Sequence, residues 1–208
     1  MNLQTLRRYL PELILSAMTL AGIVFYAVGV YDVIKLTPLY LIGTMVLLGV
    51  YLKHEKHLWY IWASAGVIGF VAEMYGVHTG RLFGSYVYGD ILGPKLYGVP
   101  LLVGLLWALV SCVIWSTLPE KLGLKRVFLL ATIATIYDVA LEHFATRFGL
   151  WSWQGSIPLS NGVGWFAVSL CIGLVLHIKK WRLSRTTLAI LILPLQTIFF
   201  VILLWLEG

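Results

Sequence analysis

The sequence has few charged residues and only two cysteines. Of its 208 residues, 12% are charged and 60% are hydrophobic, whereas about a quarter of the residues in a soluble domain are charged. The mean hydropathy is +0.90. This composition excludes an ordinary soluble domain and indicates an integral membrane protein. Cys112 and Cys171 lie in separate apolar runs, so we expect two buried free thiols rather than a disulfide or a metal site.

Several cofactor and nucleophile signatures are also missing. The apolar run 187–206 has no lysine, which excludes a retinal Schiff base at the place where seven-helix opsins carry it. The five histidines are too scattered for the multi-histidine di-iron site of membrane desaturases and hydroxylases. No Gly-x-Ser-x-Gly motif, His-Glu-x-x-His motif or phosphate-binding glycine loop is present. The remaining expectation is a reaction driven by carboxyl groups, with no cofactor and no metal.

Seven apolar runs predict seven transmembrane helices. Each run can cross the hydrocarbon core of a bilayer once tilt and snorkelling are allowed. The runs are 13–30, 38–52, 58–74, 96–118, 127–144, 162–178 and 187–206. They predict an all-α fold, a polytopic membrane helix bundle in which residues 1–208 form a single integral membrane domain.

The distribution of Lys and Arg predicts the orientation of the chain. With a cytoplasmic N-terminus, eleven basic residues, Arg7 and Arg8 among them, lie in inner segments and four lie in outer segments. Because cytoplasmic loops are enriched in Lys and Arg, we expect the N-terminus inside and the C-terminus outside, in the plasma membrane of a prokaryote. The net charge of +6 comes from short clusters between apolar runs rather than from one face, so no nucleic-acid partner is predicted.

Two segments on the predicted outer face resemble each other. Glu73 is followed by the sequence RLFGSYVY, and Glu142 is followed by RFGLWSW. Both halves run in the same direction, so we interpret them as a parallel duplication that places two similar loops side by side. Chance similarity between aromatic-rich loops is the alternative. The Gly- and Tyr-rich loop 75–95 is expected to fold over this face as a lid.

Two acidic residues in the fifth run are the main candidates for chemistry. Asp138 and Glu142 lie four residues apart and share one helical face, with Asp138 about 9 Å deep if the span ends near Phe144. Ionisable groups within a span usually face a cavity or a partner. The alternative is a packing ion pair with Arg81 or Arg147. A carboxyl group desolvated in an apolar site can keep its proton near neutral pH and act as a general acid.

Other polar residues on the same face have two interpretations each. Glu73, at the end of the third run, is an interfacial anchor or a third acid of the site. His78 relays protons or makes a loop hydrogen bond, and Arg81 and Asp90 belong to the site or pair with each other. Asn161, at the start of the sixth run, is a helix N-cap or positions a water molecule.

Aromatic residues gather toward the predicted outer face. They form either the aromatic belt of a membrane protein or a wall of rings that binds a polyene and stabilises a carbocation. Rings also occur at the predicted inner ends, so the rings by themselves favour neither interpretation. The outer residues are Tyr86, Tyr88, Trp107, Trp151, Trp153 and Trp165.

These residues together resemble the membrane-bound carotenoid 1,2-hydratases, the family of bisanhydrobacterioruberin and γ-carotene hydratases. The resemblance covers about residues 68–169. The chain differs from the family at one motif in the fifth run. Family members often have Glu-Pro there, whereas this chain has Glu142 followed by His143. The motifs that carry the resemblance are EMYGVHTGRLFGSYVY (73–88), LGP (92–94), GVP (98–100), Trp107, Asp138-x-x-x-Glu142, Trp151-x-Trp153, Pro158, Asn161 and Trp165.

The resemblance implies a hydro-lyase of carotenoid biosynthesis, which adds water to the terminal double bond of an acyclic ψ end group. The substrate would be lycopene, γ-carotene or a bacterioruberin precursor that enters from membrane lipid. We expect Asp138 to be the acid and Glu73 or Glu142 the base for water, although the roles are exchangeable. The alternatives are a carotenoid end-group cyclase and a proton-coupled transporter. The expected substrate-binding residues are His78, Arg81, Tyr86, Tyr88, Asp90, Trp107, Trp151, Trp153, Asn161 and Trp165.

Overall fold

The computed structural model describes the backbone of residues 3–208 and the side chains of residues 9–208, so the side chains of Arg7 and Arg8 lie outside the described residues. This part of the chain contains seven α-helices and four short strands. The helices are α1 (Leu3–Ala27), α2 (Thr37–Tyr51), α3 (Leu58–Thr79), α4 (Leu101–Thr117), α5 (Lys125–Arg147), α6 (Leu159–Ile178) and α7 (Thr187–Glu207). The strands are β1 (Tyr86–Tyr88), β2 (Lys95–Leu96), β3 (Val99–Pro100) and β4 (Trp151–Trp153).

The helices have the length and composition of membrane spans. Among the described residues, six helical segments are long and apolar enough to cross a bilayer, and α2 reaches this length together with the 3₁₀ helix η1 (Tyr31–Leu36) that precedes it. The 17 residues of α4 extend about 25 Å, slightly less than the hydrocarbon thickness of about 30 Å. The predicted membrane helix bundle with about seven spans is therefore confirmed.

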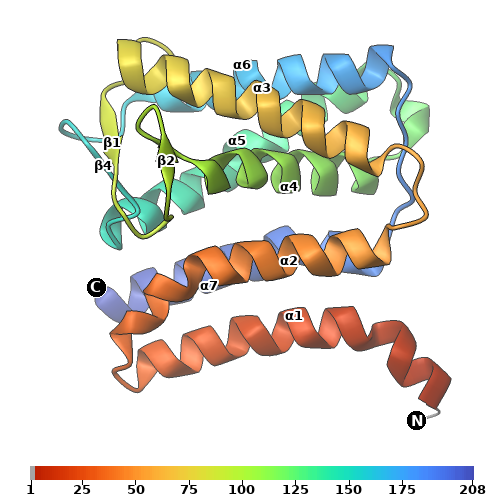
Figure 1. The fold of residues 1–208 in the computed structure, drawn as a ribbon, viewed down its shortest axis with the longest axis horizontal. Helices are drawn as coiled ribbons and strands as arrows, with labels where there is room; N and C mark the ends of the chain where they lie inside the picture. The colour runs from red at the N-terminus through yellow and green to blue at the C-terminus, as the bar shows by residue number, and fades with distance from the viewer. Residues whose placement is uncertain (1–2) are drawn as a thin grey trace.

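The helices lie in two groups with their axes roughly along one direction (Figure 1). One group contains α3, α4, α5 and α6, in which α3 packs on α4 and α5 packs on α6. The other contains α1, α2 and α7, and α7 contacts α1, α4 and α5. All four strands and the C-terminus lie at one end of the bundle, and the N-terminus lies at the opposite end (Figure 1).

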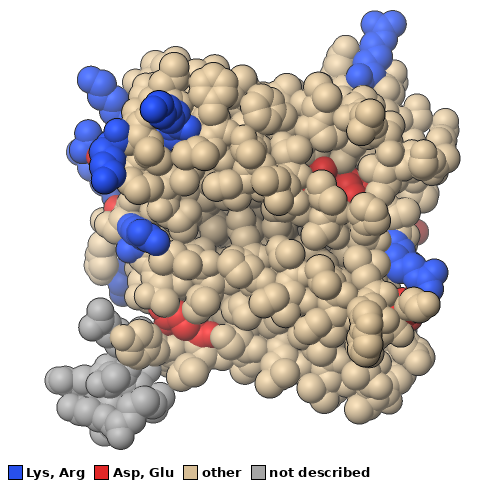
Figure 2. All heavy atoms as spheres, turned by 180° about the vertical axis from the view of Figure 1, so that it is seen from behind, with Lys and Arg blue, Asp and Glu red and all other residues tan. Residues whose placement is uncertain are grey.

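The surface is charged at the two ends and apolar between them. Figure 2 shows Lys and Arg near both ends of the helices, while the middle of this face carries neither. Large apolar side chains on the outer sides of the helices are exposed, among them Leu20, Val67 and Ile136. A surface band of this kind suits contact with lipid. Cys171 is exposed in this band, whereas Cys112 is buried, so the expectation of two buried thiols is wrong for Cys171 because it lies on the outer side of α6.

Several helix boundaries differ from the predicted ones, and three of them lie at the end of the bundle that carries the strands. Helix α3 continues to Thr79 and stops where Gly80 adopts a φ of +64°, a left-handed conformation that commonly ends helices. Helix α4 begins only at Leu101, because β2 and β3 form a hairpin before it and Pro100 is its N-cap. Helix α6 begins at Leu159 after Pro158, which excludes the N-cap interpretation of Asn161.

The two similar segments of the sequence pair with each other. Strand β1 runs antiparallel to β4, with Tyr86 opposite Trp153 and Tyr88 opposite Trp151. Part of the loop 75–95 folds over this end of the bundle as expected: β1 is fixed to β4 by backbone hydrogen bonds and forms one wall there (Figure 1). The side-by-side placement expected from a duplication is present, and the pairing follows from the alternation of aromatic residues in both strands.

Candidate active site

The paired strands turn four aromatic rings to the same face. In a strand, residues i and i+2 point the same way, so each of β1 and β4 presents both of its rings to one side. The cross-strand pairs are in ring contact, with centroids 4.8 Å apart for Tyr86 and Trp153 and 5.7 Å apart for Tyr88 and Trp151. The polar atoms of these four rings donate hydrogen bonds to the acids of the site.

Glu73 receives hydrogen bonds from three aromatic side chains. The hydroxyl groups of Tyr86 and Tyr88 both donate to Oε2 of Glu73, the latter at 2.8 Å. The indole Nε1 of Trp107 donates to Oε1 at 3.0 Å. Glu73 is 4% exposed, and no Lys or Arg of the described residues pairs with it. Its carboxyl group is therefore held by neutral donors from β1 and α4.

Glu142 repeats this arrangement on the other half of the site. The indole Nε1 atoms of Trp151 and Trp153 both donate to its Oε2, at 2.9 and 2.8 Å. In each half, an acid near the end of a long helix accepts two hydrogen bonds from the aromatic pair of the strand that follows it. This shared geometry supports the interpretation of the two segments as a duplication.

Asp138 breaks the symmetry between the halves. Its Oδ2 accepts a hydrogen bond from Nδ2 of Asn161 at 2.7 Å, while its Oδ1 is buried without any hydrogen-bond partner among the described residues. The equivalent position in the first half, four residues before Glu73, is Gly69, where the ring of Trp107 occupies the space. Only one half therefore carries a second acid, and one oxygen of that acid has unused hydrogen-bonding capacity.

The site encloses a small cavity of about 20 Å³. Glu73 and Glu142 both line it, together with Asn161, whereas Asp138 lies outside the lining, next to Asn161. The ring of Trp165 lines the cavity and stacks on Trp107 with centroids 4.1 Å apart. The remaining lining residues are Phe83, Tyr86, Tyr88, Val103, Leu106, Trp151 and Trp153. Two carboxyl groups and a ring-rich wall therefore surround one space.

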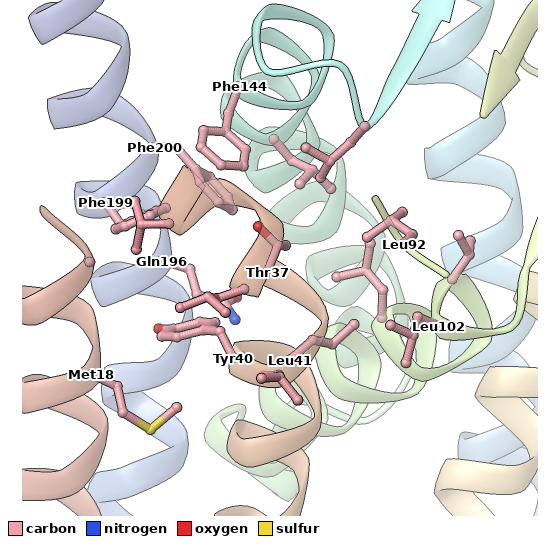
Figure 3. A pocket seen from close by; sticks show the side chains of 18 of the residues that line it. Met18, Thr37, Tyr40, Leu41, Leu92, Leu102, Phe144, Gln196, Phe199 and Phe200 are labelled. Atoms are coloured by element: carbon pink, nitrogen blue, oxygen red, sulfur yellow. The ribbon is translucent and has the colours of Figure 1, made fainter. Parts of the chain in front are cut away.

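A larger apolar cavity of about 260 Å³ adjoins the small one. It lies between α1, α2, α4, α5 and α7, and Figure 3 shows side chains from several of these elements converging on it. Val103, Leu106 and Trp151 line both cavities. An apolar ligand held in the larger cavity would therefore have its end next to the carboxyl groups.

Three of the predicted site residues lie away from both cavities. His78 is exposed and its Nδ1 lies 2.9 Å from the carbonyl oxygen of Met74. Arg81 is exposed, and Asp90 pairs with Lys95 at 2.7 Å rather than with Arg81.

The predicted ion pair between the span acids and an arginine is not present among the described residues. Arg147 instead pairs with Glu207 at 2.8 Å. Asp138 and Glu142 have neutral hydrogen-bond partners from Asn161 and the two tryptophans of β4. No group of three or more His, Cys, Asp or Glu in residues 3–208 is placed to hold a metal ion.

The tyrosine donors remain protonated over a wide pH range. Burial, and then the nearby charge of Glu73, raise the pKa of Tyr86 and of Tyr88 above the usual tyrosine value. Both groups therefore stay as phenols, which can donate hydrogen bonds, at neutral pH.

Comparison with known proteins identifies the family of the chain. The sequence model of the family described as carotenoid biosynthesis protein matches residues 34–207. The chain belongs to this family. A segment of 104 residues of the chain is 30% identical to bisanhydrobacterioruberin hydratase of Haloarcula japonica. The match covers 45% of this chain and 36% of that relative. No solved structure matches the chain.

These comparisons confirm the resemblance drawn from the sequence motifs. The matched family range contains both acid-bearing helices and both aromatic strands. The sequence alone did not reveal Tyr137 and Gln196, which line the larger cavity and bond to each other. A signal for Gln196 was available, because it is the only strongly polar side chain in the interior of the last apolar run, 187–206.

Proposed function

We propose that the chain hydrates the terminal double bond of an acyclic carotenoid end group. The observation that carries this proposal is the meeting of two carboxyl groups and a ring-rich wall in a small cavity that adjoins a larger apolar one. Membership of a carotenoid biosynthesis family and the distant similarity to a hydratase support it. The proposal makes the protein a carotenoid-modifying enzyme of the hydro-lyase type.

The chemistry requires one proton donor and one proton acceptor. A carboxylic acid gives its proton to the alkene carbon that leaves a tertiary cation on the neighbouring carbon, so a C–H bond forms as the π bond breaks. A water molecule then forms a C–O bond to the cation and loses a proton to a carboxylate. The product is a tertiary alcohol, and the net change is the addition of one water. Aromatic faces stabilise the cation between the two steps.

The hydrogen-bond pattern suggests how the acids divide these roles. Donors stabilise the ionised form of a carboxyl group, and three donors bind Glu73 while two bind Glu142. Asp138 has one donor and an unpartnered Oδ1. Three neighbouring buried acids do not all ionise together, because like charges repel. In our proposal Asp138 holds the proton, and Glu73 or Glu142, which face the cavity, receives the proton of water.

Asp138 and Glu142 lie one helical turn apart on α5. Because Asp138 does not line the cavity, its proton reaches the alkene by movement of Asn161 or through Glu142. Glu142→Gln tests the relay, because activity that survives in this variant excludes a route through Glu142 and leaves Glu73 as the acceptor of the proton of water.

The larger cavity suits one end of the substrate only. Its volume of about 260 Å³ is below the range of about 300–1,000 Å³ that encloses a drug-sized ligand. A full-length carotenoid would therefore insert one end and leave the rest in lipid. The predicted orientation puts the site at the outer side of a prokaryotic plasma membrane, with the N-terminus inside.

Expression in cells that make lycopene or γ-carotene tests the function. We expect a product heavier than the substrate by one water for each hydrated end, and we expect its oxygen to come from isotopically labelled water. The product should form equally in anaerobic cultures. An isomer of unchanged mass would indicate a cyclase instead, and a product that forms only with oxygen would exclude hydration.

The variant Asp138→Asn should abolish the product while the protein remains in the membrane. Asp90→Asn is the matched control, because Asp90 is an exposed acid at the same end of the bundle, and it should keep full activity. Full activity of Asp138→Asn would remove Asp138 from the acid role.

A further inference from the structure

The end of the bundle opposite the strands is rich in basic residues. Figure 2 shows Lys and Arg gathered at this end, where the N-terminus also lies (Figure 1). Six of the seven basic residues that follow α4 and α6 are exposed, as is common for cytoplasmic loops. The seventh, Arg126, is buried, so topology alone does not explain it. The seven are Lys121, Lys125, Arg126, Lys179, Lys180, Arg182 and Arg185.

Arg126 is held by neutral groups at the start of α5. Its side chain is 4% exposed. Its Nη2 donates a hydrogen bond to the carbonyl oxygen of Trp115, and its Cζ lies 3.8 Å from the centre of the Trp115 ring. Its Nε is buried without a hydrogen-bond partner among the described residues. These contacts fix the position of the guanidinium group and leave one of its donors unused.

The charge of Arg126 has no counter-ion within the described part of the chain. None of the four ion pairs there includes Arg126, and the nearby Glu120 pairs with Arg182 at 3.0 Å. The carbonyl group of Trp115 lies in the last turn of α4, where a helix carries about half a negative charge. A buried cation without a full opposite charge is costly. The fold therefore holds a cation whose charge is only partly compensated.

Two exposed cations lie next to Arg126. Nε1 of Trp115 donates to the carbonyl oxygen of Trp181 at 2.9 Å, which brings the segment after α6 against the end of α4. Arg182 follows Trp181 directly and lies within electrostatic range of Arg126. Lys125 precedes Arg126 on α5. Three cations and one acid therefore meet at one corner of the bundle, which attracts an anion.

The side of α5 next to this corner is apolar and exposed. Leu124 and Phe128 are 51% and 50% exposed, and because they are four residues apart they lie on the same face. Leu129 is likewise exposed, four residues after Lys125. A free anion would use only the basic corner. A phospholipid uses both parts, since its phosphate lies at the level of the helix ends and its acyl chains lie along the spans.

We infer that the phosphate group of an anionic phospholipid binds at this corner, beside Lys125 and Arg182, and supplies the negative charge that Arg126 lacks. The acyl chains of the lipid lie along Leu124 and Phe128 on the outer side of α5. This site is at the opposite end of the bundle from the three acids, so it is separate from the proposed hydration chemistry.

The melting temperature of the purified full-length protein in a neutral detergent tests this site. The probes are phosphatidylglycerol, phosphatidylcholine with the same acyl chains, and inorganic phosphate. A ligand that binds the folded protein raises its melting temperature. At ten times its dissociation constant, phosphatidylglycerol should raise the melting temperature by about 3–6 °C. The other two probes should raise it by less than about 1 °C, because one lacks the net negative charge and the other lacks the chains.

Two variants remove charge from the corner in different ways. Arg126→Met removes the buried charge and keeps a long apolar side chain. Lys125→Gln removes an exposed charge and leaves the interior untouched, so it keeps the test valid if Arg126→Met fails to fold. Each should lose at least half of the shift with phosphatidylglycerol. Lys53→Gln is the matched control, because Lys53 is an exposed cation between α2 and α3 at the same end, and it should keep the full shift.

Four results would overturn the inference. An equal shift with phosphatidylcholine would show that only the acyl chains bind, and an equal shift with inorganic phosphate would show a site for free anions. An equal loss in Lys53→Gln would assign the effect to the overall charge of this end. A full shift in both corner variants would place the lipid elsewhere. No turnover is measured, so each of these results leaves the proposed hydration untouched.

Discussion

Replacing Gly69 by alanine tests the close packing of α3 against α4 behind the site. A Cβ atom at Gly69 would lie 2.1 Å from Cγ and 2.5 Å from Cβ of Trp107. Neither atom is the free end of a flexible chain. Trp107 is fully buried, stacks on Trp165 and donates to Glu73. The new methyl group therefore cannot be accommodated without moving the indole ring.

The expected loss of folding stability in Gly69→Ala follows from overpacking of the interior. Inserting a methyl group into a tightly packed interior costs about 1–3 kcal/mol, and displacing the indole from Glu73 adds to this. For a chain of this size 1 kcal/mol shifts the melting temperature by about 2–4 °C. We expect Gly69→Ala to melt about 3–10 °C lower than the wild-type protein in the same detergent, as measured by tryptophan fluorescence.

Gly162→Ala is the matched control in the second half of the site. A Cβ atom at Gly162 would meet its nearest neighbour, Cγ2 of Thr135, at 3.8 Å, which is ordinary contact. Because alanine is favoured over glycine in a helix by about 0.5–1 kcal/mol, this variant should melt at or slightly above the wild-type temperature. If Gly69→Ala melted as high as Gly162→Ala, the close approach of α3 and Trp107 would be refuted.

Three further predictions address the donors, an exposed ion pair and pH. Trp153→Phe removes one of the two donors to Glu142, which should lower the hydration rate about 10- to 100-fold, while the exposed Trp59→Phe should leave that rate unchanged. Arg147→Ala breaks a partly exposed pair with Glu207 and should cost less than about 1 kcal/mol, so a larger loss of stability would contradict the structure. The raised pKa of Tyr88 means that its phenol stabilises the fold fully below about pH 10 and that this stabilisation is lost at higher pH. The fall in melting temperature above pH 10 should therefore be smaller in Tyr88→Phe than in wild type.

Sequence patterns predicted the helices well where the signal was local. Length and hydropathy placed α7 to within one residue of its observed end, because an apolar run bounded by polar residues is read directly from composition. The boundaries at α3, α4 and α6 were wrong by three to five residues. There the helix ends depend on Gly80, on the β2–β3 hairpin and on Pro158, whose effects depend on how the chain folds around them.

Local patterns also picked out the candidate site residues, but they did not separate the residues that face the acids from those at the surface. The sequence grouped His78, Arg81 and Asp90 with Tyr86 and Tyr88, because all five fall in one polar stretch. The structure turns the two tyrosines toward Glu73 and leaves the other three exposed at the surface. The three exposed residues lie outside β1 (Tyr86–Tyr88). Alternation along β1 puts both tyrosines on one face, and the direction of that face is fixed only by the pairing with β4.

The sequence by itself determined that the chain crosses a membrane, that three acids lie near the ends of two spans, and that an aromatic pair follows each of those spans. These properties follow from composition and from the period of a helix, which are local. Only the tertiary structure decided that β1 pairs with β4, that each aromatic pair binds the acid of its own half, and that Gly69 stands where the second half has Asp138. It also decided that an apolar cavity between five helices shares lining residues with the small cavity beside Glu73 and Glu142. Such contacts join residues far apart in the chain, and their free energy depends on packing that no short segment contains.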